Sequence, residues 1–224
     1  MKETIRALAL GLGADVCGFA GADRFDGAPA GFRPQDILAS CRTVIVVGVA
    51  LPRGIAAVRP EILYNHANNL AQAEADRIAL RLAAGLERTC GGVAVSLPGD
   101  SPYEYWDAPR KEGRGILSMK HAAVLAGIGT LGKSTLLLSR RFGTRLDLSA
   151  VLTDAVFETD PPSEPVCLPG CSLCLDRCPV GALDGMSANQ KRCREHTYDT
   201  NARGFSIVRC NICRTGCPMA AGKD

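Results

Sequence analysis

The sequence predicts an α/β (α+β) domain with a mixed central sheet flanked by helices, followed by a smaller cysteine-rich domain. Three observations support this prediction. Over the first 160 of the 224 residues, apolar runs typical of strands alternate with stretches of helical periodicity. A Pro-rich connector, "DPPSEP", begins at residue 160 and marks a change of composition. Eight of the eleven cysteines lie beyond it, so the predicted domains are residues 1–160 and 161–224.

The first 100 residues contain the elements of a layered structure. Residues 2–12 carry apolar side chains at helical spacing, and "ADVCGFAG" then predicts a short strand. "RTVIVVGVAL" is a β-branched run typical of a buried strand. The next stretch opens with Pro60, ends in Gly91 and Gly92 and repeats Ala, Leu and Ile at helical spacing, which predicts a long helix. "VAVSL" predicts a further strand, and the alternation favours α/β layers.

A glycine segment in the middle of the chain, "GIGTLGKS", satisfies the phosphate-loop pattern G-x-x-x-x-G-K-[ST]. A phosphate loop needs a strand before it and a helix after it, because the amides of the helix N-terminus hold the phosphate. Here a predicted loop over 98–115 and a helix in "GILSMKHAAVLAG" come first, and two apolar runs around "RRFGTR" follow as a predicted β-hairpin. We therefore interpret the segment as a helix end and a tight turn, without ATP.

The composition is that of a globular protein, with 46% hydrophobic and 22% charged residues. The N-terminus has no secretory signal pattern, because Glu3 and Arg6 interrupt its apolar residues. No stretch reaches the roughly 18 apolar residues of a membrane-spanning helix. These features predict a cytoplasmic protein that does not enter a membrane, a compartment where lasting disulfides are rare.

Two cysteine runs dominate the predicted second domain. "CLPGCSLCLDRCP" sets its cysteines four, three and four residues apart, and "CNICRTGCP" repeats the last two intervals. Both runs end in Cys-Pro. In two-cluster ferredoxins, three cysteines of such a run bind one cluster and the fourth, before Pro, binds the other. The spacing therefore predicts a ferredoxin-like domain with two 4Fe-4S clusters.

Eight cysteines are then divided into two sets of four. The second run lacks a leading cysteine, and Cys193 is the remaining thiol that can replace it. The predicted sets are Cys167, Cys171, Cys174 and Cys217 for one cluster, and Cys178, Cys193, Cys210 and Cys213 for the other. The interval after Cys167 is one residue longer than in the ferredoxin pattern.

Other interpretations of the cysteines remain open. Two zinc sites with four thiolates each also use C-x2-C elements, although zinc gives no reason for two Cys-Pro pairs. Disulfides are a further alternative. Cys17, Cys41 and Cys90 lie in apolar segments and are expected to be packing residues.

The segment "HAAVLAGIGTLGKSTLLLSRRFGTRLDLSAVLTD", joined to the connector and the cysteine runs, resembles the core of the epoxyqueuosine reductases. These are iron-sulfur enzymes of tRNA modification related to reductive dehalogenases. "GADVCGFAG" and "DILASCRTVIVVGVALP" are similar to the start of the same family. The resemblance implies a cobalamin-type cofactor in the first domain, near the glycine segment: Gly127, Gly129, Gly132 and Lys133.

The sequence also departs from that family. The acidic residue taken there as the proton donor corresponds to Gly113, with Glu112 beside it as a substitute. The helical-repeat domain that helps hold tRNA in the family is not expected here, because the chain stops seven residues after Cys217. The resemblance therefore implies a short, divergent relative.

Two functions follow as hypotheses. The first is an iron-sulfur oxidoreductase that passes electrons to a corrinoid or a substrate in the first domain. The second is a non-catalytic electron carrier or redox subunit that docks a partner protein. Expected partners are an electron donor such as a ferredoxin or flavodoxin, and a small-molecule or tRNA substrate.

No catalytic residue is assigned from the sequence. The three histidines are scattered, although His121 on the predicted helix could approach a cofactor, and "SPYEYWD" offers Tyr103, Tyr105 and Trp106 for stacking. From Ser187 onward, seven Lys or Arg stand against three Asp or Glu. This basic tail could meet RNA or an acidic partner, or only offset the negative charge of clusters.

Overall fold

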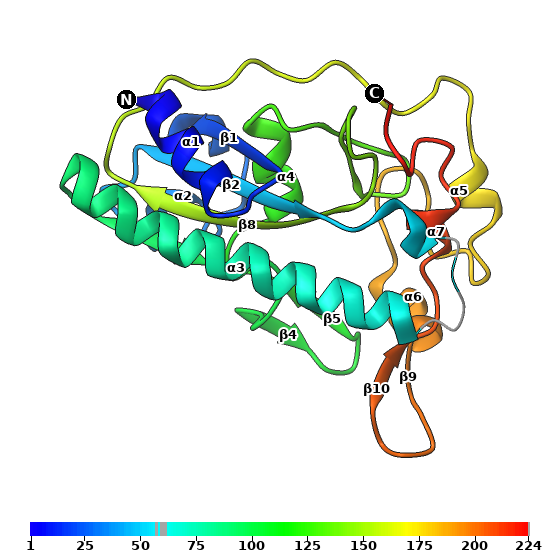
Figure 1. Ribbon diagram of the computed structural model, residues 1–224. Coiled ribbons are helices and arrows are strands. Elements are labelled where there is room, and N and C mark those ends of the chain that lie inside the picture. Colours follow the sequence, from blue (N-terminus) through cyan, green and yellow to red (C-terminus); the bar gives the residue numbers. More distant parts are fainter. Residues whose placement is uncertain (57, 59–61, 224) are drawn as a thin grey trace.

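The protein is built on a four-stranded central sheet (Figure 1). The structure is a computed structural model that describes residues 1–56, 58 and 62–223. In spatial order the strands are β1 (Val16–Gly21), β2 (Thr43–Ala50), β8 (Leu146–Thr153) and β3 (Ala94–Leu97). The two strands at the centre, β2 and β8, are each eight residues long, and β8 is buried throughout.

Every hydrogen-bonded pair of strands among the described residues is antiparallel, whereas the sequence predicts a mixed sheet. The reason lies in the position of β8. Helix α3 (Ile62–Cys90) joins β2 to β3, and these two strands run in the same direction, as expected for a strand–helix–strand unit. The later strand β8 lies between them and pairs antiparallel with both. The predicted α/β class is confirmed, but the sheet has no parallel neighbours.

Alternate residues of the central strands pack on opposite faces of the sheet, as the two-residue period of a strand requires. In β2, Ile45 and Val47 lie in a core with α3 and with α1 (Lys2–Gly11). Val44 and Val46 lie in a second core with α4 (Met119–Leu125) on the other face. The helices predicted at 2–12 and within 115–127 therefore exist and cover different faces.

The long helix α3 ends at Cys90, directly before Gly91 and Gly92, as predicted. Its predicted start at Pro60 lies outside the described residues. It is 29 residues long but carries charged side chains along its length, and no helix among the described residues is apolar enough to span a membrane.

The region around the glycine segment differs from the sequence prediction. The two apolar runs around "RRFGTR" do not form a hairpin with each other. The first, β7 (Leu137–Leu138), pairs with β6 (Thr130–Leu131) inside the glycine segment, and the second is β8 of the central sheet. Two short runs with equally good partners elsewhere cannot be paired from their composition alone. The predicted order of helix, glycine segment and strand is confirmed, which excludes a phosphate loop.

The predicted loop over 98–115 contains a short hairpin. Its strands are β4 (Tyr105–Asp107) and β5 (Glu112–Arg114), paired antiparallel. The remaining connections of the first 160 residues are short: η1 (Ala22–Phe25) and α2 (Pro34–Ile37) join β1 to β2, and η2 (Arg53–Ala56) follows β2.

The cysteine-rich tail lies at one end of the sheet. Figure 1 shows the Pro-rich connector running from the end of β8 along the molecule to this tail, beside the C-terminus. The elements of the tail are α5 (Leu173–Asp176), α6 (Gln190–Thr197), β9 (Tyr198–Thr200), β10 (Ser206–Val208) and α7 (Ile212–Thr215). Strands β9 and β10 form a hairpin that projects from the body of the protein.

Arg214 of α7 fixes the tail to the sheet. Its guanidinium donates to Asp147 Oδ1 on β8 at 2.9 Å and to the side-chain oxygens of Tyr64 (2.9 Å) and Asn68 (2.6 Å) on α3. Its side chain is 16% exposed and that of Asp147 only 7%. Gly143 allows the backbone of the tail to approach, because a Cβ there would lie 2.1 Å from the Met219 carbonyl oxygen.

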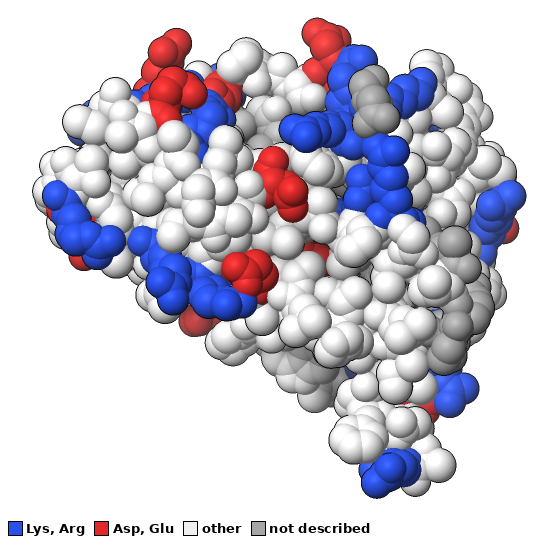
Figure 2. Space-filling view, viewed as in Figure 1, with Lys and Arg blue, Asp and Glu red and all other residues white. Residues whose placement is uncertain are grey.

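The surface seen in Figure 2 carries charges of both signs. Lys and Arg side chains gather on this face near the C-terminal end of the described chain, and the tip of the projecting hairpin is also basic.

Candidate functional site

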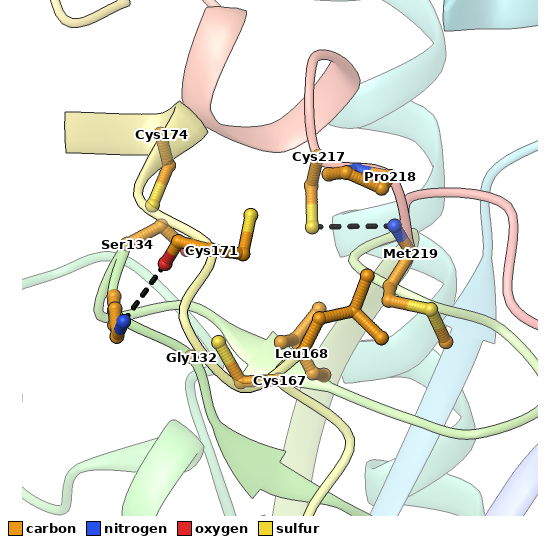
Figure 3. A pocket seen from close by; sticks show the side chains of 11 residues that line it. Gly132, Ser134, Cys167, Leu168, Cys171, Cys174, Cys217, Pro218 and Met219 are labelled. Carbon is orange, nitrogen blue, oxygen red and sulfur yellow. Dashed lines mark hydrogen bonds between the residues drawn. The ribbon is translucent and has the colours of Figure 1, made fainter. Parts of the chain in front are cut away.

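The structure brings four predicted cysteines to one pocket (Figure 3). Cys167 and Cys171 lie on the loop after the connector, Cys174 lies on α5, and Cys217 follows α7. Figure 3 shows their sulfur atoms facing a common space. We call these four thiols the first thiol set.

Packing and hydrogen bonds hold the first thiol set in place. Leu138 of β7 packs with Val166 and Met219 beneath Cys167 and Cys217. The Met219 N–H donates to Cys217 Sγ at 3.4 Å, and Lys133 Nζ donates to the Cys171 carbonyl oxygen at 2.8 Å (Figure 3). Hydrogen bonds of this kind orient metal-ligating sulfurs and tune bound clusters.

The other four predicted cysteines also lie together, and we call them the second thiol set. Cys178 follows α5, Cys193 lies on α6, Cys210 follows β10 and Cys213 lies on α7. Burial first, and then the neighbouring thiols of Cys193, Cys210 and Cys178, raise the pKa of Cys213 to about 11. The β9–β10 hairpin is the segment that returns the chain from Cys193 to Cys210.

The two thiol sets exchange members between the two cysteine runs. Cys217 of the second run lies in the first thiol set. Burial first, and then the other three thiols of that set, raise the pKa of Cys217. Cys178 of the first run lies beside Cys213, and the Ala182 N–H donates to Cys178 Sγ at 3.2 Å. The assignment of the two thiol sets to two clusters stays a prediction.

The zinc alternative requires four sulfurs about 2.3 Å from one ion. Within the described ranges, no group of three or more His, Cys, Asp or Glu side chains lies close enough together to hold a metal ion, and this applies to zinc and to iron alike. The remaining cysteines lie apart from both thiol sets. Cys17 and Cys41 are buried in the cores and Cys90 is half-buried at the end of α3, as expected for packing residues.

The first part of the glycine segment packs against protein, while Gly132 and Lys133 line a cavity of about 560 Å³. A Cβ on Gly127 would lie 2.3 Å from the Pro161 carbonyl oxygen, and one on Gly129 would lie 2.2 Å from that of Leu138. Gly132 and Lys133 line the pocket of the first thiol set. The structure therefore places the four residues predicted to bind the cofactor between the sheet and the cysteine-rich tail.

A cavity of about 630 Å³ lies on the α4 side of the first domain. Its walls come from four segments: η1 and the loop after it, the end of β5 with the turn that follows, α4, and one residue of α6. The side chains include Phe25, Phe32, Leu117, Val124 and Leu125 as apolar walls, and Arg24, Arg114, Lys120 and His121 as cations or titratable groups. We call this space the α4 cavity.

Two groups of the α4 cavity have shifted pKa values. Burial lowers the pKa of Lys120 from its usual value. Burial and the nearby Lys120 charge lower the pKa of His121, whose Nδ1 lies 2.7 Å from Ser118 Oγ. Sequence reasoning noted His121 but missed Lys120, because nothing in its local pattern separates it from a surface lysine.

Helix α6 binds the β4–β5 hairpin to the edge of the α4 cavity. Gln190 lines the cavity and exchanges two hydrogen bonds with the backbone of Gly113. Arg194 donates to the Tyr103 hydroxyl at 3.0 Å and lies 5.2 Å from the rings of both Tyr103 and Trp106. Of the aromatic residues that the sequence offered for stacking, Tyr103 and Trp106 stack on each other and on Arg194, whereas Tyr105 lies against Arg114.

The position expected to hold an acid has no acid facing the α4 cavity. Gly113 lines the cavity, while Glu112 pairs with Arg114 at 2.8 Å and lines a separate groove beside α6. Among the described residues that line the α4 cavity, none is Asp or Glu.

Fold and site together define a class: proteins with an antiparallel central sheet, helices on both of its faces and a cysteine-rich tail. No protein-family model matches the chain. Curated relatives match the chain in sequence. The epoxyqueuosine reductase of Lactococcus garvieae is 27% identical over 99% of this chain and 70% of its own length. That of Bacillus subtilis is 34% identical over 49% of this chain and 31% of its own.

Solved structures share the fold over 97–100% of this chain. The epoxyqueuosine reductase from Streptococcus thermophilus matches with a TM-score of 0.70 and 23% identity, over 100% of this chain and 67% of that one. An epoxyqueuosine reductase with a tRNA-Tyr stem loop matches with a TM-score of 0.66 and 22% identity, over 100% and 66%. The catabolic reductive dehalogenase NpRdhA matches with a TM-score of 0.69 and 20% identity, over 97% and 31%.

These comparisons confirm the resemblance that the sequence indicated, to the epoxyqueuosine reductase-like proteins. The chain spans about a third of the length of these relatives in the shorter alignments and about two thirds in the longer ones.

Proposed function

We propose that this protein is an iron-sulfur oxidoreductase that passes electrons through two 4Fe-4S clusters to an acceptor in the first domain. The observation that carries the proposal is α6, which contributes Cys193 to the second thiol set and Gln190 to the α4 cavity. One turn of helix therefore separates a thiol ligand from the cavity wall. The proposed division is residues 1–160 for the acceptor site and 161–224 for a ferredoxin-like cluster domain.

The donor atoms fit 4Fe-4S clusters. Eight thiols in two sets of four are the ligands that such clusters use, and the ligand exchange between runs matches two-cluster ferredoxins. When bound, each cluster would carry one electron at a time. The first thiol set would hold one cluster and the second thiol set the other. Backbone N–H donors to Cys178 and Cys217 would stabilise the thiolates.

The α4 cavity, of about 630 Å³, lies within the size range of cavities that enclose a drug-sized ligand. A second cavity of about 560 Å³ lies beside Gly132 and Lys133. A corrinoid, which the resemblance implies, would lie at this second cavity and would supply a reducible metal. We propose that the α4 cavity holds the substrate.

Two substrate classes suit a cavity of this volume: a small molecule and a single nucleoside of an RNA. The RNA class draws on the similar reductase that was solved with a tRNA stem loop. An electron donor of the ferredoxin or flavodoxin type would supply electrons to the clusters of the tail. The tail carries more Lys and Arg than Asp and Glu, and this positive charge would attract an acidic donor.

One observation favours a second function, that of a non-catalytic electron carrier that docks a partner protein. The α4 cavity lacks a carboxylic acid at the Gly113 position, so the reaction would need another proton donor. Turnover of any substrate by the isolated chain with an artificial reductant would contradict this second function.

Anaerobic purification followed by assays of iron, sulfide, zinc and cobalt tests the proposal. We expect about eight irons per chain and a visible absorbance that dithionite bleaches. Zinc in place of iron would overturn it. Titration with cobalamin follows: no spectral shift agrees with a substrate as the direct acceptor, whereas a saturable shift at one equivalent would show that a corrinoid binds.

A further inference from the structure

The α4 cavity has an unbalanced charge. Its lining includes Arg24, Arg114 and Lys120, and no carboxylate among the described residues faces it. Only Arg114 has a carboxylate partner, Glu112, at 2.8 Å. The cavity wall therefore presents two cations without a counter-ion.

Arg24 is held by neutral groups. Its Nη1 donates to the carbonyl oxygens of Leu125 (2.8 Å) and Asp160 (3.1 Å). These contacts fix the side chain but leave its charge uncompensated. Within the described residues, its Nε and Nη2 have no acceptor, so one edge of the guanidinium is free to bind an anion.

Lys120 has neither a hydrogen bond nor an ion pair in the part of the chain that the structure describes. It is half-buried on α4 beside His121, and burial disfavours its charge. A desolvated cation without a partner destabilises the folded state unless a ligand supplies the opposite charge. The apolar side chains of Phe25, Phe32 and Leu117 complete a wall of mixed character.

We propose that the α4 cavity binds a small organic anion, whose carboxylate or phosphate group lies against Lys120 and Arg24 and whose apolar part packs on Phe25 and Phe32. This inference rests on the proposed function, because it names the substrate class for the same cavity. An RNA chain also carries anionic phosphates, so the RNA stem loop included in the test below decides between a free small molecule and RNA.

Calorimetric titration of the anaerobically purified protein tests the inference. The probes are benzoate, phenyl phosphate and the uncharged benzamide, which share a ring and differ in charge. We expect one of the anions to bind at least tenfold more tightly than benzamide, and the better anion identifies the acid group of the ligand. Equal affinity for benzamide, or binding of none of the three, would overturn the inference.

Variants localise the charge effect. Lys120→Met should weaken binding of the preferred anion about 10- to 100-fold, the range for a hydrogen bond to a charged group. Lys120→Arg should restore most of it, and Arg203→Gln on the projecting hairpin removes a charge elsewhere and should change nothing. An unchanged affinity in Lys120→Met would refute the assigned position. So would a short RNA stem loop that binds through Lys120 while neither anion does.

The same samples separate the two proposals. Iron content and visible absorbance report whether the clusters are present, whatever the titration shows. If clusters are absent, the proposed function fails. If they are present and charge does not matter for binding, only the anion site fails. If Lys120→Met does not fold, the comparison of charged and uncharged probes in the unaltered protein still decides.

Discussion

Gln190 and Gly113 exchange two hydrogen bonds. The Gly113 N–H donates to Gln190 Oε1 at 2.9 Å, and Gln190 Nε2 donates to the Gly113 carbonyl oxygen at 3.1 Å. The side-chain amide of Gln190 therefore pairs with the peptide groups of Gly113 in the way that the backbone of a neighbouring strand would. Because Gln190 lies on the helix that carries Cys193, the pair connects the cysteine-rich tail to the wall of the α4 cavity.

Gln190→Ala should loosen the β4–β5 hairpin. The loss of two neutral hydrogen bonds is expected to cost about 1–3 kcal/mol of local stability. Hydrogen exchange of peptides covering residues 103–116 should become faster, whereas the iron content should stay the same. Lys191→Ala, on the exposed next position of α6, is the matched control. Unchanged exchange in Gln190→Ala would show that Arg194 alone holds the hairpin.

Arg214→Met should detach the tail from the sheet. The substitution leaves Asp147 buried without its cation, and breaking such a pair costs about 3–5 kcal/mol. Urea denaturation under anaerobic conditions should show the loss. The double variant Arg214→Met with Asp147→Leu removes both charges and should recover much of it. A double variant as unstable as the single one would mean that packing, and not the charge, governs this site.

Asp160 gives the protein an acid-dependent contact at the domain boundary. Although burial opposes its charge, Lys2 (2.7 Å), Arg6 (2.9 Å) and the Phe19 N–H (2.9 Å) lower the pKa of Asp160 below its ordinary value. Its contribution is therefore complete above the ordinary pKa of about 4 and is lost as the pH falls through the lower folded value.

Asp160→Asn should therefore lower the melting temperature at pH 7, by the equivalent of about 1–3 kcal/mol, and have little effect at an acidic pH below the lowered pKa of Asp160. Comparison of the variant with the unaltered protein at each pH cancels the general effect of acid on the clusters. A difference that is the same at both pH values would mean that the Asp160 charge does not contribute.

Cys213→Ser should reduce the iron content from about eight per chain to about four or fewer, because Cys213 belongs to the second thiol set. The electron paramagnetic resonance spectrum of the reduced protein should then lose its coupling between two clusters. Cys41→Ala is the control, since Cys41 is buried in the core with its Sγ 3.5 Å from the Thr43 carbonyl oxygen. Loss of iron in the control would contradict its role as a packing residue.

Gly127→Ala should destabilise the protein far more than Gly31→Ala. Both glycines have a positive φ, 72° and 86°, so alanine is strained at either position. At Gly127 the new Cβ would also meet the Pro161 carbonyl oxygen at 2.3 Å, while the space around Gly31 is open. We expect an extra cost of about 1–3 kcal/mol at Gly127 by thermal denaturation. Equal costs would mean that the connector moves aside freely.

The sequence was sufficient for the elements with a strong local signal. β1, β2, β3 and the long α3 follow from β-branched runs and helical spacing. The division of the cysteines into two sets stays a prediction from their intervals. The hairpin of β4 and β5 was missed because each strand has only three residues and packs mainly through Gln190 and Arg194. The pairing of β8 between β2 and β3 depends on long-range competition among apolar runs, which local patterns do not report.

The α4 cavity was beyond sequence reasoning for a related reason. Phe25, Lys120 and Gln190 lie far apart in the chain and become neighbours only when η1, α4 and α6 meet. The glycine segment shows the reverse case, a clear sequence pattern without the site that the pattern usually forms. Its phosphate-loop pattern is conspicuous, yet the structure uses Gly127 and Gly129 to let the connector and β7 pass close by.

The exchange of one thiol between the two cysteine runs has a consequence for assembly. Cys217 of the second run lies in the first thiol set and Cys178 of the first run lies in the second. Neither half of the tail can therefore complete a thiol set alone. A nascent chain completes the second thiol set only with Cys213 and the first only with Cys217, so neither set exists until both cysteine runs have been synthesised.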